Sequence, residues 1–170
     1  MTEAPLRVHG RCWLFGDNVP TDQLVRADLV FGPLEEIRRH VLENLNPAFP
    51  VEVRPGDVVV AGRHFGQSSG RAIATRALKA TGIGCVVAES FARTFYRNAF
   101  EIALPVLECP GVTERVAGGD LLSVDVPSGE VVDETSGVRL QGRPTPPFLL
   151  RMLEAGGLIP LAAGLAGEEA

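Results

Sequence analysis

The residues with the clearest chemical potential lie between positions 62 and 78, which read GRHFGQSSGRAIATRAL. Within the serine loop (66–72), Ser69 and Arg71 stand among glycines, after a run of valines and before a helix-like pattern. The free N–H groups and the positive dipole end of a helix N-terminus stabilise an anion. A serine hydroxyl held there could act as an alkoxide, and an arginine can grip a carboxylate through two parallel hydrogen bonds. Such a loop suits a small polycarboxylate.

The same loop has a simpler interpretation, in which Ser68 or Ser69 only caps the following helix and the glycines form the turn. Asp22 is open to a similar choice, because it lies in the turn-rich segment GDNVPTD (16–22) and is either a turn-forming residue or a site residue. His64 is interpreted as a polar loop residue. Taken alone, these residues do not decide between a turn and a site.

The elements that must position the serine loop follow from the spacing of apolar residues. They are, in chain order, a strand at 6–15, one amphipathic helix at 34–45, a turn at 55–57, a strand at 58–62, a helix at 71–81, a strand at 83–89, a helix at 91–102 and a strand at 103–108. Gly82 is the expected C-cap of the first long helix after the loop, and Ser90 is the expected N-cap of the next. The alternation predicts a βαβαβ core.

The last third of the chain has a different pattern. Two alternating runs around a Pro-Ser-Gly turn predict a β-hairpin at 121–134, and a segment that starts with proline and ends in glycine predicts a helix at 146–157. We expect the tail at about 164–170 to be flexible. Without internal repeats or a long linker, residues 1–170 are predicted to form a single domain with its core at about 6–160.

The composition is that of a globular protein and argues against nucleic-acid binding. The chain has 170 residues, of which 45% are hydrophobic and 22% charged, as is usual for a globular protein. Its net charge is −5, and its sixteen Lys and Arg residues are scattered along the sequence. Since nucleic-acid binding requires a basic stripe or patch, we expect no nucleic-acid partner.

The three cysteines, Cys12, Cys85 and Cys109, are far apart and form no CxxC spacing. This argues against a disulfide framework and against a metal site on this chain alone, and favours a reducing compartment. The N-terminus has no apolar segment of signal-peptide length, and no apolar run reaches the roughly 20 residues that a membrane span needs. We therefore expect a cytoplasmic protein with no membrane association.

Several separated motifs resemble those of the small subunits of 3-isopropylmalate dehydratase, the detached swivelling domain of the aconitase superfamily. The family's serine loop reads FGCGSSREHA, and an ungapped alignment on FG places Ser69 on its first serine, Gly70 on its second and Arg71 on its arginine. GDNVPTDQL (16–24) resembles the family's GDNIDTDQI, and RPGDVVVAGRHFG (54–66) resembles its KPGDIIVAGKNFG. The resemblance extends over roughly residues 6 to 160.

The resemblance implies an α/β fold of the aconitase swivel type, a barrel-like β/β/α domain with a mixed sheet flanked by helices. It implies a hydro-lyase that interconverts hydroxy-dicarboxylic acids by dehydration and rehydration. A large subunit would hold a 4Fe-4S cluster, whose open iron takes the substrate hydroxyl and a carboxylate, and this chain would bind no metal itself. The two chains would form a heterodimer or heterotetramer.

The resemblance also implies roles for single residues. Ser69 would remove the proton from the carbon next to a carboxylate, and Asp22 would lie at the edge of the active site as a second catalytic residue. Arg71 would hold a substrate carboxylate, with Ser68 and Gly70 contributing to the substrate-binding loop. We expect the loops of Ser69 and Asp22 to meet at one edge of the sheet.

The segment that sets substrate choice differs from the family's. Where isopropylmalate enzymes commonly contain YLRT, this chain has Leu29, Val30 and Phe31, followed by Gly32. We expect these three apolar residues to contact the substrate branch. Because the arginine is lost, unless Arg26 folds back to replace it, a related substrate is an alternative, as in 2,3-dimethylmalate dehydratase or homoaconitase.

The serine loop differs from the family's as well. Gly70 replaces a serine, and Ala72 and Ile73 replace the glutamate and histidine that usually follow the arginine. Part of the usual hydrogen bonding around the loop is therefore missing. A catalytically idle homologue with a scaffold role is a further alternative.

Overall fold

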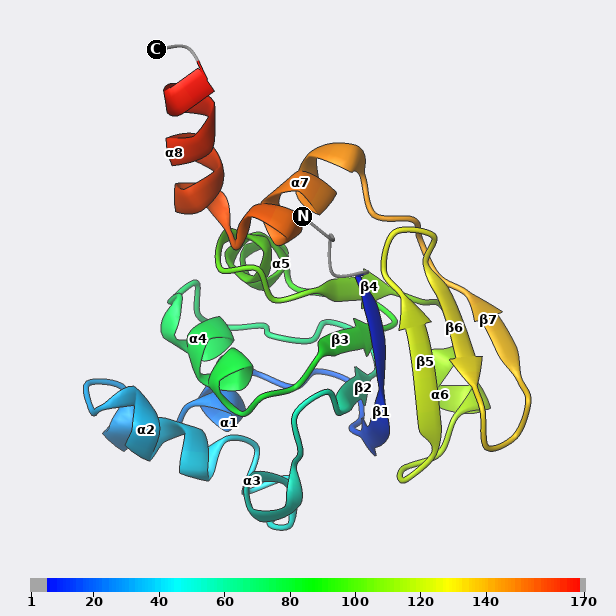
Figure 1. Cartoon of the computed structure of the whole chain (residues 1–170). Coiled ribbons are helices and arrows are strands. Elements are labelled where there is room, and N and C mark those ends of the chain that lie inside the picture. The colour runs from blue at the N-terminus through cyan, green and yellow to red at the C-terminus, as the bar shows by residue number, and fades with distance from the viewer. Residues whose placement is uncertain (1–5, 169–170) are drawn as a thin grey trace.

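A computed structural model describes residues 6–168, which form an α/β fold around a seven-stranded sheet (Figure 1). The strand order is β4-β3-β2-β1-β5-β6-β7; β1 to β4 are parallel, and β5 to β7 continue from β1 in antiparallel pairing. The strands are β1 (Arg7–Leu14), β2 (Val58–Ala61), β3 (Cys85–Ala88), β4 (Val106–Glu108), β5 (Leu121–Asp125), β6 (Glu130–Asp133) and β7 (Arg139–Gln141). The predicted α/β class, with a mixed sheet flanked by helices, is confirmed.

The parallel half contains the predicted βαβαβ core, with helices α4 (Ile73–Ala80) and α5 (Arg93–Glu101) between its strands. Every residue of β2 and β3 is buried. Figure 1 shows α4 and α5 on one side of these strands and the short α6 (Val112–Arg115), which contacts β2 and β3, on the other. Because helices cover both faces of β2 and β3, these strands consist of continuous runs of Val, Ala and Cys.

The antiparallel half begins with the predicted hairpin, since β5 pairs with β6. Buried and partly exposed residues alternate along both strands, as expected where one face meets the core. A third strand, β7, was not expected from the sequence and pairs with β6. Figure 1 shows β5 to β7 turned away from the parallel strands, so that the sheet is curled.

The single amphipathic helix predicted at 34–45 is wrong. The chain forms α2 (Leu34–Ile37) and a 3-10 turn η2 (Arg38–His40), and then leaves helical geometry at Val41, whose φ and ψ are −61° and 127°. Leu42 has a φ of 57°, and its N–H donates to the carbonyl of Gln23. Both side chains are fully buried, so packing into the core outweighs continuation of the helix.

Other predicted boundaries need smaller corrections. The helix expected at 71–81 begins at Ile73, so Arg71 precedes it, and Gly82 follows it in left-handed geometry, as expected of its C-terminal turn. Ser90 is not an N-cap, because α5 begins after Ala92; the Ser90 hydroxyl instead accepts the backbone N–H of His64.

The described residues also contain short helices that the sequence did not predict. They are α1 (Thr21–Leu24), which takes up the end of the expected turn at 16–22, η1 (Ala27–Leu29) and α3 (Phe49–Glu52). All three lie in the crossover from β1 to β2, where bends and short helical turns carry the chain around the parallel half of the sheet.

The C-terminal part consists of α7 (Pro147–Ala155), which confirms the helix predicted at 146–157, and α8 (Leu158–Glu168). Residues 164–168 belong to α8 and 169–170 lie outside the described residues, so the expected flexibility of the tail stays a prediction. Figure 1 shows α8 projecting from the body of the protein. No single described helix is long and apolar enough to cross a membrane; α7 and α8 meet these criteria only as a pair bent by 94°.

Candidate functional site

The serine loop begins at Gly66, directly after Phe65, and both residues are buried in the core. Phe65 is fully buried and packs edge to face against Phe95 of α5, with 5.2 Å between ring centroids. Gly66 has a φ of +81°, and a Cβ built on it would lie 2.3 Å from the Phe95 ring. Only glycine fits this position without moving α5.

Backbone hydrogen bonds join the serine loop to the segment before Asp22. The N–H of Asn18 donates to the carbonyl of Arg63, that of Gly66 to Val19, and that of Thr21 to Gln67. Pro20 and Gln67 form an isolated parallel bridge. This pairing of residues 18–21 with 63–67, called here the loop pairing, brings two distant segments together beyond the ends of β1 and β2.

Ser69 is held at both its backbone and its side chain. Its N–H donates to the hydroxyl oxygen of Thr21 at 3.2 Å, and its own hydroxyl oxygen accepts the N–H of Arg71 at 3.2 Å. It does not cap α4, whose N-cap is Ala72 without a side-chain hydrogen bond. The structure therefore does not support the interpretation of Ser69 as a simple helix cap.

The backbone of Ser68 supports the ungapped alignment. Ser68 has a φ of +91°, a geometry in which glycine is favoured and serine is strained. The aligned family residue at this position is glycine. At the next glycine, Gly70, an added Cβ would lie 3.0 Å from the Thr94 methyl group, so the family's serine would be crowded here.

Ser69, Asp22 and Arg71 meet around one pocket of about 290 Å³, called here the serine pocket. This confirms that the two loops meet at one edge of the sheet. Its remaining lining residues are Thr21, Val25, Ala27, Val30, Ile73 and Ala74. Asp22 and Arg71 are exposed, and neither forms an ion pair with another of the residues 6–168. The pocket thus combines an acidic group, a basic group and a hydroxyl with an apolar wall.

Of the other predicted substrate-binding residues, Val30 lines this pocket, whereas Ser68, Gly70, Leu29 and Phe31 do not. Ser68 and Gly70 are exposed parts of the loop, and Leu29 packs partly against the core. Phe31 is 95% exposed, and the guanidinium carbon of Arg71 lies 6.0 Å from the centre of its ring. Phe31 therefore contacts the carboxylate-binding candidate rather than the pocket wall, and the roles of these residues stay predictions.

Arg26 is not available to replace the missing loop arginine. Its guanidinium donates to Asp28 at 2.8 and 3.1 Å and to Glu43 at 2.9 Å. A ring N–H of His40 donates to the same Glu43 carboxylate, and this hydrogen bond, followed by one to Glu36, raises the pKa of His40. These ion pairs anchor the loop that carries Val30.

Sequence reasoning missed five lining residues, of which Thr21 is the most informative; the others are Val25, Ala27, Ile73 and Ala74. Thr21, Val25 and Ala27 follow one another across the short helix α1 and the turn after it, where no long apolar pattern exists. Ile73 was regarded only as a departure from the family's loop. The one available signal was the family-like TDQL motif (21–24), to which Thr21 belongs and which Val25 follows directly.

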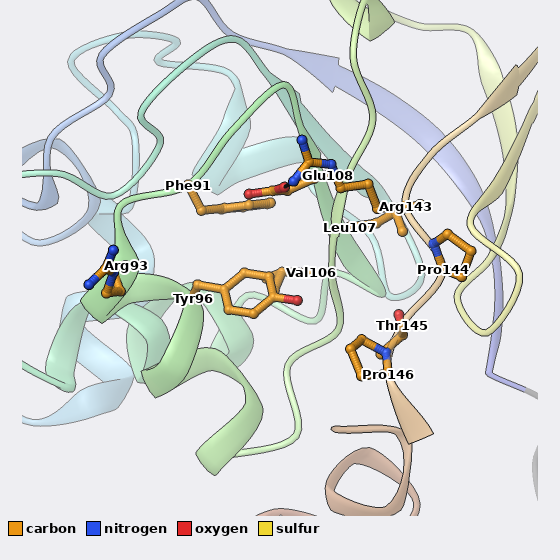
Figure 2. A pocket seen from close by; sticks show the side chains of 10 residues that line it. All are labelled: Phe91, Arg93, Tyr96, Val106, Leu107, Glu108, Arg143, Pro144, Thr145 and Pro146. Carbon is orange, nitrogen blue, oxygen red and sulfur yellow. Dashed lines mark ion pairs between the residues drawn. The ribbon is translucent and has the colours of Figure 1, made fainter. Parts of the chain in front are cut away.

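A second pocket, of about 380 Å³, contains none of the predicted site residues. This aromatic pocket (Figure 2) is lined by Phe91, Arg93, Tyr96, Val106, Leu107, Glu108, Arg143, Pro144, Thr145 and Pro146. The Glu108 carboxylate and the Arg143 guanidinium lie 3.0 Å apart. The Thr145 hydroxyl donates to the Val126 carbonyl. Burial, and next the Glu108 charge, raise the pKa of Tyr96, so its phenol stays neutral.

The cysteines are poor candidates for metal ligands. All three are buried and free. Burial raises the pKa of Cys12 and of Cys85 to about 12 and that of Cys109 to about 11, so the thiolates that metals bind are disfavoured. Within residues 6–168, no group of three or more His, Cys, Asp or Glu side chains is arranged to hold a metal ion. The described residues do not fit an iron–sulfur cluster.

Known proteins match this chain closely. Residues 36–110 match the family model of the aconitase C-terminal domain. The chain is 47% identical over 154 residues to the isopropylmalate/citramalate isomerase small subunit of Methanocaldococcus jannaschii, covering 90% of this chain and 92% of that protein. It is 46% identical over 155 residues to 3-isopropylmalate dehydratase small subunit 1 of Methanopyrus kandleri, covering 91% of each.

A solved structure shares the fold as well. The crystal structure of a 3-isopropylmalate dehydratase from M. jannaschii superimposes with a TM-score of 0.89 at 30% identity, covering 96% of this chain and 99% of that one. Sequence and fold thus agree over almost the whole length. The chain belongs to the family of 3-isopropylmalate dehydratase small subunits, the hydro-lyase subunits of the aconitase superfamily.

Proposed function

We propose that this chain completes the active site of a 3-isopropylmalate dehydratase when it binds a large subunit. The observation that carries this proposal is the serine pocket, where Ser69, Asp22 and Arg71 lie beside an apolar wall. Its polar groups suit a hydroxy-dicarboxylate, and its apolar residues suit the branch of such a substrate. The high identity to named small subunits supports the same reaction class.

Arg71 binds a substrate carboxylate. Its guanidinium has no carboxylate partner among residues 6–168, so binding a substrate breaks no existing ion pair. The planar fork of an arginine donates two parallel hydrogen bonds to a carboxylate, which fixes orientation as well as charge. The contact with Phe31 covers one side of the guanidinium.

Ser69 acts as the base. In the proposed dehydration, its oxygen takes the proton from the carbon next to a carboxylate, the C–O bond on the neighbouring carbon breaks with loss of hydroxide, and a double bond forms. Water then adds in the opposite sense. The Arg71 N–H, which donates to the Ser69 oxygen, stabilises the serine alkoxide that this step needs. Asp22 lines the same pocket as a second polar group.

The partner supplies what this chain lacks. We place the 4Fe-4S cluster of the family's chemistry on the large subunit, because the described residues offer no ligand set for it. Since Asp22 and Arg71 are exposed, the serine pocket also needs a covering surface to exclude water. The three buried, free cysteines fit a reducing compartment, and we assign the protein to the cytoplasm.

The favoured substrate is 3-isopropylmalate, with malates bearing other apolar branches as alternatives. Val25, Val30 and Ile73 line the pocket, and such a wall discriminates weakly between branches that differ by one methylene. The M. jannaschii relative is named for both isopropylmalate and citramalate, which have branches of different size. A third carboxylate, as in citrate or homocitrate, would face this wall unpaired.

The test is reconstitution with a large subunit of the same family under anaerobic conditions with iron and sulfide. We expect the chain alone to be colourless and inactive, and the complex to hydrate isopropylmaleate, with the mass of a heterodimer or heterotetramer in solution. The Ser69→Ala complex is the matched control. Steady hydration by the chain alone would contradict the proposal, and a stable but inactive complex on every branched malate would identify a scaffold instead.

A further inference from the structure

Thr21 lies where the segment that leads to Asp22 meets the serine loop. It is the first residue of α1 and is 7% exposed, and it also lines the pocket. Its backbone N–H donates to the Gln67 carbonyl at 2.9 Å, which is the last hydrogen bond of the loop pairing. The segment that leads to Asp22 (16–22), called here the aspartate loop, therefore meets the serine loop with Thr21 in a fixed place.

The Thr21 hydroxyl extends this pairing by one side-chain bond. It accepts the N–H of Ser69 at 3.2 Å. Without it, that N–H would have no acceptor within the described residues, and the chain from Ser68 to Arg71 would be tied to the aspartate loop at no point beyond Gln67. The Asn98 amide would still donate to the Gly70 carbonyl at 3.0 Å, so the loss would free mainly Ser68 and Ser69, and Ser68 is already in a strained left-handed geometry.

Two consequences follow for the reacting groups. Fixing the Ser69 backbone fixes the direction of its hydroxyl, which must also meet the N–H of Arg71. Asp22 directly follows Thr21 in the chain, so the same contact sets the separation of Asp22 from Ser69. Misplacing a catalytic group by about 1 Å costs on the order of 100-fold in rate.

We propose that Thr21 is a positioning residue for the dehydration, which acts by holding the backbone of Ser69 through its hydroxyl oxygen. This inference rests on the proposed function, since it assigns Thr21 a role through the proposed base. It does not require Thr21 to contact the substrate.

The matched pair of variants is Thr21→Val, which keeps the shape but removes the hydroxyl, and Thr21→Ser, which keeps the hydroxyl. In the reconstituted complex, we expect Thr21→Val to lower kcat by about 10- to 100-fold with KM changed by less than about threefold. Thr21→Ser should recover kcat to within about threefold. In a Ser69→Ala background, Thr21→Val should have no further effect, because both changes act through the same group.

A second readout does not depend on activity. Hydrogen exchange at the Ser69 amide, measured by NMR on the full chain, should be at least about tenfold faster in Thr21→Val than in the parent and unchanged in Thr21→Ser. If Thr21→Val does not fold, Thr21→Cys, whose sulfur is a weak acceptor, takes its place with the same expectations.

Several results would overturn the proposal. They are an unchanged kcat in Thr21→Val, an equal loss in Thr21→Ser, an additive loss in the Ser69→Ala background, or unchanged amide exchange. An inactive parent complex with faster exchange in Thr21→Val would refute the proposed function and leave the contact itself established. An inactive parent with unchanged exchange would refute both.

Discussion

The serine pocket lies beyond the ends of β1 and β2, whereas the aromatic pocket lies against the edge strand β4, and the charged residues of the two pockets differ in how they are paired. In the aromatic pocket, which is the larger, Arg143 and Glu108 neutralise each other and the Thr145 hydroxyl is used by a backbone carbonyl. In the serine pocket, Asp22 and Arg71 have no such partners among residues 6–168.

An unpaired guanidinium alone does not separate the two pockets, because Arg93 of the aromatic pocket also forms no ion pair among residues 6–168. The serine pocket differs in combining an unpaired carboxylate, an unpaired guanidinium and a hydroxyl, whereas the carboxylate of the aromatic pocket, Glu108, is already paired with Arg143. The following predictions test this contrast, beginning with the largest expected effect.

Replacing the proposed base should give the largest loss. We expect Ser69→Ala to lower kcat of the reconstituted complex by about 10²- to 10⁴-fold, the usual contribution of a positioned general base. Folding and large-subunit binding should be retained, as measured by thermal unfolding and gel filtration. The neighbouring change Ser68→Gly should lose less than about threefold, since glycine suits a φ of +91°. A larger loss from Ser68→Gly than from Ser69→Ala would show that the aligned serine is the wrong one.

Replacing Arg71, whose guanidinium has no ion-pair partner among residues 6–168, should give the second largest effect, a weaker binding of substrate. We expect Arg71→Lys to raise KM by about 10- to 100-fold, because an ammonium cannot reproduce a two-point hydrogen bond worth roughly 1.5–3 kcal/mol. Steady-state kinetics on the complex measure this. Arg76→Lys on the exposed face of α4 is the matched control. An unchanged KM in Arg71→Lys would remove Arg71 from carboxylate binding.

The apolar wall should affect substrate choice rather than overall rate. We expect the parent complex to prefer isopropylmalate or dimethylmalate to citrate and homocitrate, compared by kcat/KM. Val30→Ala should lower kcat/KM for isopropylmalate by about tenfold relative to citramalate, since lost methyl contacts are worth about 1 to 3 kcal/mol. A clear preference for citrate or homocitrate would show that Val30 does not face the branch.

The aromatic pocket should give the smallest effect. We expect Arg143→Gln to change kcat/KM by less than about twofold and to alter the free energy of unfolding by at most about 1 kcal/mol, because its ion pair with Glu108 lies near the surface. Urea unfolding and kinetics on the same preparation measure both. A tenfold loss of kcat/KM in Arg143→Gln would contradict this expectation and would show that the aromatic pocket contributes to catalysis.

Much of the fold could be predicted because its signals are local. The all-buried strands β2 and β3, the hairpin of β5 and β6 and the glycine after α4 each have a short-range cause. The helix predicted at 34–45 failed because its spacing is compatible with a helix, while burial of Val41 and Leu42 in separate core positions is decided by tertiary packing.

The candidate site could be predicted in part for the same reason. Ser69, Asp22 and Arg71 were found through motifs, and the structure brings them to one pocket. Thr21 was not found, because its importance lies in a bond to a residue 48 positions away, and no local pattern reports such a bond. The ion pair between Arg26 and Glu43 could not be predicted either, because the two residues are 17 positions apart in the sequence.

The loop pairing also has a consequence for how the protein acquires its activity during folding. Residues 18–21 and 63–67 can meet only after β1 and β2 have paired in parallel, which requires closing the long crossover between them. We therefore expect substrate binding to appear late in refolding, at the rate at which β1 and β2 pair. It should not appear at the faster rate at which α4 forms. In a refolding experiment, ligand binding would then report on completion of the native state and not on any earlier compact intermediate.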